Sequence, residues 1–197
     1  MYIPKHFEVT APETLAAFVD THAFGMLITA PQGRPYASHV PFLADIEHGI
    51  LSCHVARANP QWLQFEAAPE VLVIFTGPHG YISPTWYTDP GVPTWNYSAV
   101  HVYGTARVVD DLEHTARHVE ALAAKFERGN ASPWAPDYDP RRLGGIVGIE
   151  VRIRSIEGKF KLSQNRSAAD RNGVIAKLRA SGHAPDAELA ELMEASL

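Results

Sequence analysis

Two neighbouring stretches of sequence decide the fold: GYISPTWY at residues 80–87 and PTWNYSAVHVYG at residues 93–104. Both are rich in aromatic and β-branched residues, which favour strands, and the turn residues Asp89-Pro90-Gly91 separate them. The pattern predicts extended segments over residues 81–87 and 94–109. Because neighbouring side chains of a strand face opposite sides, the aromatic residues cannot all lie on one face. We expect them to serve mainly as core and as subunit contact.

Shorter runs of the same kind continue through most of the chain. They predict further strands at residues 26–30, 36–43, 50–55, 71–76 and 146–156. One amphipathic helix is expected over residues 111–128, with these apolar side chains facing inward: Leu112, Val119, Leu122, Ala123 and Phe126. Strands in runs predict a mostly β protein of the α+β class, an antiparallel barrel or sandwich with helices attached. Regular βαβ alternation and a GxGxxG fingerprint are absent, which argues against a dinucleotide-binding Rossmann domain.

Length and composition fit one globular domain. The 197 residues are 46% hydrophobic and 20% charged, which is an ordinary balance. We expect residues 1–166 to form one domain and residues 167–197 to form a helical extension of two short helices packed on it. The net charge of -5 argues against direct nucleic-acid binding, and the extension itself carries three Arg/Lys against five Asp/Glu. Cys53 is the only cysteine, so an intrachain disulfide is excluded and a buried position is expected.

The sequence lacks the patterns of secreted and membrane-spanning proteins. Residues 1–7 do not combine a basic region with a long apolar stretch. No apolar run approaches the ~20 residues that a helix needs to cross a bilayer. The expected location is therefore the cytoplasm, without a membrane partner.

The clearest candidate binding feature follows the strand predicted at residues 50–55. Asn59 is a favoured N-cap and Pro60 a favoured first helical residue, so a short helix is expected to begin here. Its unpaired N–H groups and the guanidinium of Arg57 would together suit a monophosphate. The alternative interpretation is an ordinary helix cap beside an exposed arginine.

A second candidate is the stretch KFKLSQNR at residues 159–166. Its amide side chains can pair with donors and acceptors on the edge of a planar ring, although a solvated strand end leading into a helix cap is the alternative. His114 and His118 lie four residues apart on the long helix but lack the glutamate of an HExxH metal motif. We therefore predict no metal site and assign both histidines to a solvated helix face.

These segments, taken together, resemble a known family. Seven collinear motifs carry the resemblance to the PaiB-type FMN-binding negative transcriptional regulators, and they span most of the chain, from residue 1 to about residue 180. The motifs are MYIPKHF at 1–7, SHVPF at 38–42, ANPQW at 58–62, YISPTWY at 81–87, VPTWNY at 92–97, VHVYG at 100–104 and GKFKLSQN at 158–165.

The resemblance implies a split β-barrel of the pyridoxamine-phosphate-oxidase-like class, working as a homodimer with FMN in a groove at the subunit interface. The phosphate would lie near residues 54–59 and the ring along residues 38–42, with residues 95–96 or 161–165 closing the groove from the partner subunit. Arg57 lacks the adjacent second cation of the oxidases. The residues expected to contact FMN are Ser38, His39, Val40, Pro41, His54, Arg57, Asn59, Gln61, Trp95, Asn96, Lys161, Ser163, Gln164 and Asn165.

The function that the resemblance implies is regulation by a flavin-binding homodimer, acting without direct DNA recognition. The first alternative is a flavin-dependent oxidoreductase that uses NAD(P)H, with Lys161 or His39 placed near the ring. A haem-binding split barrel with an axial histidine is the second alternative. Catalytic residues are not assigned.

Overall fold

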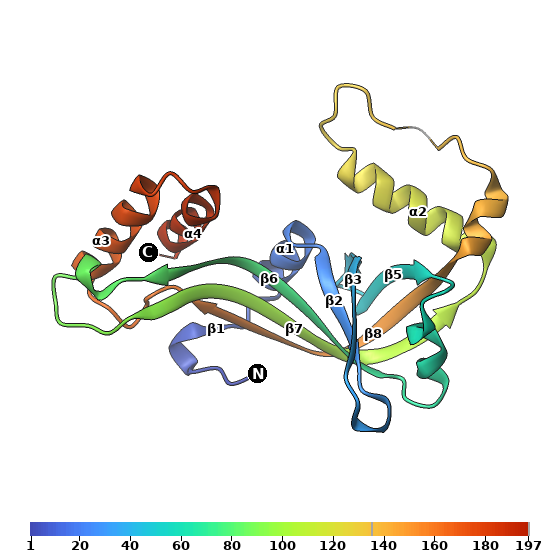
Figure 1. Ribbon diagram of the computed structural model, residues 1–197, viewed down its shortest axis with the longest axis horizontal. Coiled ribbons are helices and arrows are strands. Elements are labelled where there is room, and N and C mark those ends of the chain that lie inside the picture. The colour runs from blue at the N-terminus through green and yellow to red at the C-terminus, as the bar shows by residue number, and fades with distance from the viewer. Residues whose placement is uncertain (135, 197) are drawn as a thin grey trace. The chain divides into compact units, whose positions relative to one another are not determined.

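The computed structural model describes residues 1–134 and 136–196, and Figure 1 shows the arrangement of the elements. The strands are β1 (Glu8–Val9), β2 (Phe24–Thr29), β3 (Tyr36–Pro41), β4 (Leu43–Asp45), β5 (Ile50–Ala56), β6 (Glu70–Ile82), β7 (Thr94–Val109) and β8 (Ile146–Lys161). The α-helices are α1 (Pro12–Thr21), α2 (Leu112–Phe126), α3 (Ala168–Ala180) and α4 (Ala184–Ala195). Short 3-10 turns are η1 (Lys5–Phe7), η2 (Pro31–Gly33), η3 (Pro60–Glu66), η4 (Pro84–Trp86) and η5 (Pro140–Gly145).

Within the described residues the strands form one eight-stranded sheet. Its order is β3-β2-β6-β7-β8-β5-β4, with β1 paired to β8. Every pairing with a defined register is antiparallel, as in β2–β3, which runs from Phe24 opposite Pro41 to Thr29 opposite Tyr36. The predicted antiparallel α+β fold is therefore confirmed, and β6, β7 and β8 are its longest strands.

The chain divides into two compact units. Unit 1 contains residues 1–18, 76–100 and 157–197, and unit 2 contains residues 19–75 and 101–156. The predicted helical tail belongs to unit 1, where Leu178, Leu189 and Met193 are fully buried. Leu189 of α4 lies against Gly80 of β6, so the tail packs on a strand of the same unit. The predicted boundary at residue 166 stays a prediction.

Unit 2 has a core built by alternation along its strands. Leu51, Cys53 and Val55 of β5 are buried, whereas Ser52 and His54 lie on the half-buried face. In β2 and β6 the same alternation buries further apolar side chains, such as Leu27, Val73 and Phe75. The prediction that Cys53 is buried is confirmed, and burial raises the pKa of its thiol. The face of β5 that carries His54 is thus left for contacts outside the core.

Three details of the sequence-based expectation are wrong. The extended segment predicted over residues 81–87 ends at Ile82, because Ser83 caps the turn η4. The aromatic residues of that region are exposed or half-buried and not core: Tyr81, Trp86, Tyr87, Trp95, Tyr97 and Tyr103. On α2 the buried residues are Thr115, His118 and Leu122, whereas Leu112 and Phe126 are exposed. A helix that packs on a polar strand face buries polar side chains, which hydrophobic periodicity does not detect.

None of the helices in the described part of the chain is both long and apolar enough to cross a membrane.

Candidate functional site

Unit 2 contains a groove between β3 and β5 with a volume of about 500 Å³. The lining residues come from these two strands and from the segments that follow them: Ser38, His39, Val40, Pro41, His54, Val55, Ala56, Asn59 and Ile146. Six of the fourteen residues predicted to contact the cofactor therefore line a single groove. They come from two segments of the sequence, which makes the groove the leading candidate for a binding site.

Asn59 ties the two walls of the groove together. Its Nδ2 donates to Ser38 Oγ at 2.8 Å, and its Oδ1 accepts from the Tyr36 hydroxyl at 3.2 Å. The same Oδ1 caps η3 by accepting from the Gln61 N–H at 3.0 Å. The predicted N-cap is confirmed, although the element it caps is a 3-10 helix of seven residues. Since one side chain holds both β3 and η3, the groove has a fixed polar corner.

Gln61 lies outside the groove and fills a structural position. Its side chain is fully buried, and Nε2 donates to the Leu27 carbonyl at 2.9 Å and to Thr29 Oγ1 at 3.3 Å. These contacts fasten η3 to β2. Its Oε1 is buried and has no hydrogen-bond partner among the described residues. The donors of the amide therefore hold the fold, and a contact of Gln61 with the cofactor stays a prediction.

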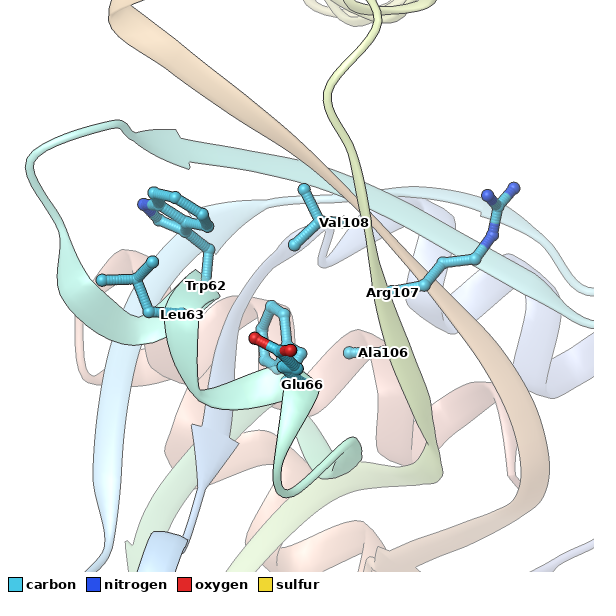
Figure 2. Close-up of a pocket in the computed structure, with 7 residues that line it drawn as sticks. Trp62, Leu63, Glu66, Ala106, Arg107 and Val108 are labelled. Atoms are coloured by element: carbon cyan, nitrogen blue, oxygen red, sulfur yellow. The ribbon is translucent and has the colours of Figure 1, made fainter.

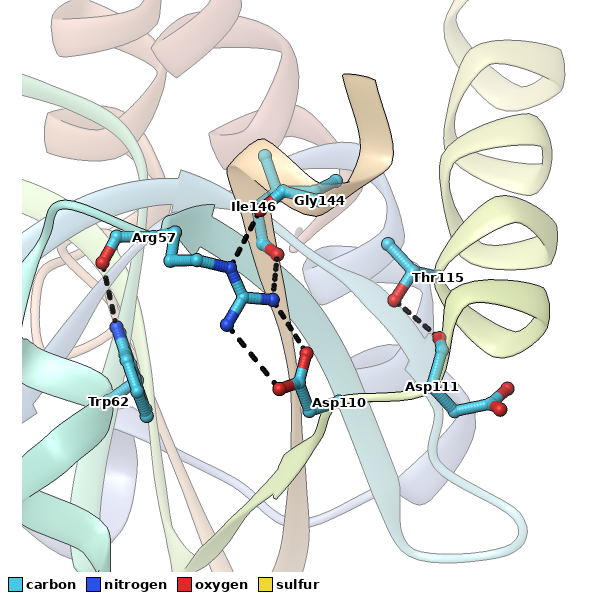
Figure 3. Close-up of polar contacts among 7 residues, drawn as sticks. All are labelled: Arg57, Trp62, Asp110, Asp111, Thr115, Gly144 and Ile146. Carbon is cyan, nitrogen blue, oxygen red and sulfur yellow. Dashed lines mark hydrogen bonds and ion pairs between the residues drawn. The ribbon is translucent and has the colours of Figure 1, made fainter. Parts of the chain in front are cut away.

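Arg57 is engaged within the protein (Figure 3). Its Nε donates to the Gly144 carbonyl at 2.7 Å, and its Nη2 donates to the Ile146 carbonyl at 3.1 Å. The same Nη2 pairs with Asp110 Oδ1 at 2.6 Å. The guanidinium lowers the pKa of the Asp110 carboxyl, chiefly by the hydrogen bond between them. The predicted phosphate-binding arginine thus holds the segment before β8 and is already neutralised by a carboxylate.

This arrangement makes a prediction about the variant Arg57→Gln. Since the guanidinium is occupied, removing it should change FMN affinity less than threefold and should instead loosen residues 140–146. Hydrogen exchange of that segment should speed up, while a fluorescence titration with FMN measures the affinity. A loss of affinity of tenfold or more, without faster exchange, would instead assign Arg57 to the ligand.

His54 and His118 form a direct contact on the outer face of β5. Their ring nitrogens, His118 Nε2 and His54 Nδ1, are 3.2 Å apart. Only 7% of His118 is exposed, so the prediction that it lies on a solvated helix face is wrong. Burial lowers the pKa of His54. Burial, followed by the charges of His54 and His114, lowers the pKa of His118 to about 4. Both imidazoles are therefore neutral at physiological pH.

The lowered pKa of His118 predicts a pH-dependent loss of stability. Its pKa in the folded protein is about 4, below the ordinary value of 6.5, so the unfolded chain binds more protons between these values. The free energy of unfolding should fall as the pH falls from 6.5 to 4. We expect this histidine to account for about 2 kcal/mol of that loss, allowing for partial solvent screening.

Urea denaturation at pH 7 and pH 4.5 measures this effect in the wild type and in the variant His118→Gln. The contribution of the other titrating groups cancels when the two proteins are compared. The variant should lose less stability than the wild type over this range. Equal losses in both proteins would mean that His118 is charged in the folded state.

The other predicted cofactor residues belong to unit 1, where most of them bind one another. Asn96 Nδ2 donates to Ser163 Oγ at 2.9 Å, and both side chains are buried. Ser163 has a φ of +64°, a left-handed conformation that this contact helps to hold. Gln164 closes its own turn, since Nε2 donates to the Phe160 carbonyl at 2.6 Å and Oε1 accepts from the Leu162 N–H. These three residues stabilise the end of β8.

Lys161 also forms hydrogen bonds within the protein, whereas two of the predicted cofactor residues of unit 1 face solvent. Its Nζ donates to Thr94 Oγ1 and to the Trp95 carbonyl, both at 2.6 Å. Burial, followed by the charge of Lys159, lowers the pKa of the Lys161 ammonium. The side chains of Trp95 and Asn165 are exposed. Of the residues predicted from this stretch, these two are placed to meet a ligand or a second molecule.

A second hollow of unit 2 lies between η3 and β7 (Figure 2). Its volume is about 340 Å³, and its walls are mainly apolar, formed by residues such as Trp62, Leu63 and Val108. Figure 2 shows that the Arg107 side chain extends away from η3, and its guanidinium pairs with Glu150. The Glu66 carboxylate is the charged group on η3. This hollow is smaller than the groove, and its anionic wall is unsuited to a phosphate.

Val55 and Ala56 fall within the predicted segment 54–59 but were not named as contacts, and Ile146 and His118 were missed by sequence reasoning. Val55, Ala56 and Ile146 line the groove, and Ala56 faces Ile146 in the register of β5 and β8. That pairing joins residues 90 positions apart, so local patterns do not show it. For His118 the sequence signal was weak: the residue lies on α2, the helix that covers the polar face of β5.

Comparison with known proteins defines the class. Residues 1–155 match the family model described as "Putative FMN-binding domain", and the chain belongs to this family of flavin-binding split barrels. It is 41% identical over 204 residues to the protease synthase and sporulation protein PAI 2 of Bacillus subtilis (strain 168), with 100% of this chain and 98% of that protein covered. The predicted PaiB-type resemblance and the predicted FMN cofactor are therefore confirmed.

Solved structures support the split-barrel fold. The FAD and heme binding protein of Mycobacterium smegmatis superposes with a TM-score of 0.66, at 17% identity, over 89% of this chain and 80% of that chain. The flavocytochrome Anf3 of Azotobacter vinelandii superposes with a TM-score of 0.64, at 14% identity, over 81% and 72%. At this level of identity the likeness concerns the fold alone. The predicted fold class is confirmed.

Within the described residues, no group of three or more His, Cys, Asp or Glu side chains is placed to hold a metal ion.

Proposed function

We propose that the groove between β3 and β5 is the FMN site of this protein. The observation that carries the proposal is the convergence of two separate segments, residues 38–41 and 54–59, on one groove of about 500 Å³. FMN, when bound, supplies electron and hydride transfer, and the protein supplies position and charge. The Asn59–Ser38 corner offers hydroxyl and amide groups to the polar edge of a ligand. Pro41, Ala56 and Ile146 supply apolar contact for a planar ring.

The protein works as a homodimer, with the groove at the subunit interface. Large apolar side chains on the surface of both units support this assembly. In unit 1, Trp95 is 55% exposed and has its ring 6.2 Å from that of Tyr81, which is 46% exposed. In unit 2, Leu63 is 59% exposed beside the hollow of Figure 2. Through its exposed face, Trp95 of one subunit covers the cofactor bound to the other.

The biological role is regulation in the cytoplasm without direct DNA recognition. The net charge of -5 supports this role, as do the contacts of the C-terminal helices. Arg179 of α3 forms a bidentate ion pair with Glu194 of α4, at 2.8 and 2.6 Å. Arg171 donates to the Ser196 carbonyl at 2.9 Å. Two of the three cations of the tail are therefore used inside it, which leaves a poor surface for a phosphate backbone.

Three measurements test this proposal. A flavin absorption spectrum of the purified protein, with FMN identified by mass after release, should confirm the cofactor. Light scattering after size-exclusion chromatography should give twice the mass of the chain. A gel-shift assay should show no tight, salt-sensitive binding to specific DNA. A colourless protein that does not bind added FMN overturns the site, a monomer overturns the assembly, and sequence-specific DNA binding overturns the mode of regulation.

A flavin-dependent oxidoreductase that uses NAD(P)H is the second candidate. The observation that favours it is the exposed position of His39 on the groove wall, where its imidazole can meet a second reactant. Anaerobic addition of NADH or NADPH tests it, because a reductase bleaches the flavin absorption within seconds to minutes. A flavin that stays oxidised would argue against the oxidoreductase and leave regulation as the proposed function.

A further inference from the structure

The contact between His54 and His118 joins two hollows of unit 2. His54 lines the groove between β3 and β5, and His118 lines a neighbouring pocket of about 250 Å³ with Ser52 and Glu150. The ring nitrogens that face each other are 3.2 Å apart, so one ring donates a proton and the other accepts it. The rings meet nearly edge to face, at 78°. The pair is thus a single hydrogen-bonded unit with one end at the groove.

The groove itself offers few side chains that can carry positive charge for a phosphate. Arg57 is bound to Asp110 and to two carbonyl groups. Among the described residues that line the groove, His39 and His54 are the side chains able to become cations. Since His54 is coupled to His118, a proton taken up by either ring places its charge beside the groove.

We propose that the His54–His118 pair recognises the phosphate of a flavin mononucleotide by taking up one proton from solvent when that phosphate binds. The inference rests on the proposed FMN site. It adds a determinant by which the groove distinguishes FMN from riboflavin, which has the same ring and no phosphate.

The proton balance follows from the geometry. In the neutral pair, one hydrogen lies between His54 Nδ1 and His118 Nε2, and one of the two outer nitrogens, His54 Nε2 or His118 Nδ1, carries no hydrogen. That bare nitrogen accepts the proton, which leaves one positive charge shared over the pair. A second proton would place two N–H groups against each other across 3.2 Å. The pair therefore takes up one proton and no more.

The surrounding charges keep the free pair neutral and leave it responsive to an anion. From α2, His114 and Arg117 line the same pocket as His118, and both oppose protonation when charged. The Glu150 carboxylate on β8 favours protonation, but Arg107 already pairs with it and His114 lies 3.4 Å from it. Asp45 on β4 is bound by His48. An added phosphate within about 4–6 Å would raise the pKa of the pair, because a nearby negative charge favours the protonated form.

Calorimetric titration measures this uptake directly. FMN and riboflavin are titrated at pH 7.0 into the wild type in buffers of different ionisation enthalpy, which gives the number of protons exchanged per ligand. We expect about half a proton to be taken up with FMN, and almost none with riboflavin. FMN affinity should rise about threefold when the pH is lowered from 7.5 to 6.5, since the complex binds more protons.

The variants His54→Gln and His118→Gln should each abolish the uptake and weaken FMN binding about tenfold, with little change for riboflavin. His183→Gln, an exposed histidine that precedes α4 in unit 1 and lines neither the groove nor the pocket of His118, is the matched control and should keep the wild-type proton count. FMN binding without proton uptake in the wild type, or uptake that survives both variants, overturns this inference and leaves the FMN site intact. No FMN binding overturns the site itself, and with it the inference.

Discussion

FMN binding is expected to be lost, by about 100-fold in Kd or more, when Ala56 is replaced by tryptophan. Ala56 is an exposed residue at the end of β5, and its side chain lines the groove. An indole at this position fills the space that the ring of the cofactor would occupy, and no hydrogen bond of a side chain is removed. Fluorescence quenching of FMN on titration with the protein measures the affinity.

The matched control is Ala121→Trp, an exposed alanine of α2 that does not line the groove. It should bind FMN like the wild type, and both variants should unfold at wild-type urea concentrations. If Ala56→Trp binds FMN normally while it is folded, the cofactor lies elsewhere.

Stability should fall by about 3 kcal/mol in the variant Gly104→Ala. A Cβ atom at Gly104 of β7 would lie 2.4 Å from the Arg152 carbonyl oxygen and 2.7 Å from Val151 Cγ1 on β8. Because the first of these atoms belongs to the backbone, the two strands must move apart to admit the methyl group. Equilibrium unfolding in urea measures the change.

Gly145→Ala provides the control for this substitution. A Cβ atom at Gly145 has no atom of the described chain within 4 Å, so its stability should change by less than about 0.5 kcal/mol. Similar midpoints for the two variants would mean that β7 and β8 are not closely packed at Gly104.

Most of the elements could be predicted from sequence because their signals are local. β7 has the bounds that were predicted for it, and the tail forms the two short helices that were predicted there. The lengths of β6 and β8 were underestimated. Each continues past a glycine, Gly77 in β6 and Gly158 in β8, where local propensity predicts an interruption.

The candidate site could be predicted only in part, because proximity depends on strand pairing. Residues 38–41 and 54–59 were selected by motif, and the structure brings them to one groove. The hydrogen-bond partners of each side chain could not be predicted in this way. Arg57 resembles a phosphate ligand in sequence, but Asp110 and the Gly144 carbonyl, far along the chain, occupy it. Ser163 resembles a ring contact, but it is bound to Asn96.

His118 is the opposite case: it was predicted to face solvent, and a partner far along the chain buries it. His118 is polar and follows the charged Arg117, so its residue type places it at the surface. In the structure, α2 covers the face of β5 that carries His54, and a polar residue is buried because it meets another polar residue. A buried hydrogen-bonded pair of this kind requires the three-dimensional partner before it can be recognised.

A crystal structure of the protein with FMN bound tests the central claim most directly. We predict that the cofactor contacts residues 38–41 of β3 and the segment from His54 to Asn59, with its phosphate within reach of the His54–His118 pair. Density for FMN in the hollow between η3 and β7, or at any place that leaves Ser38, His54 and Asn59 without contact, would contradict the claim.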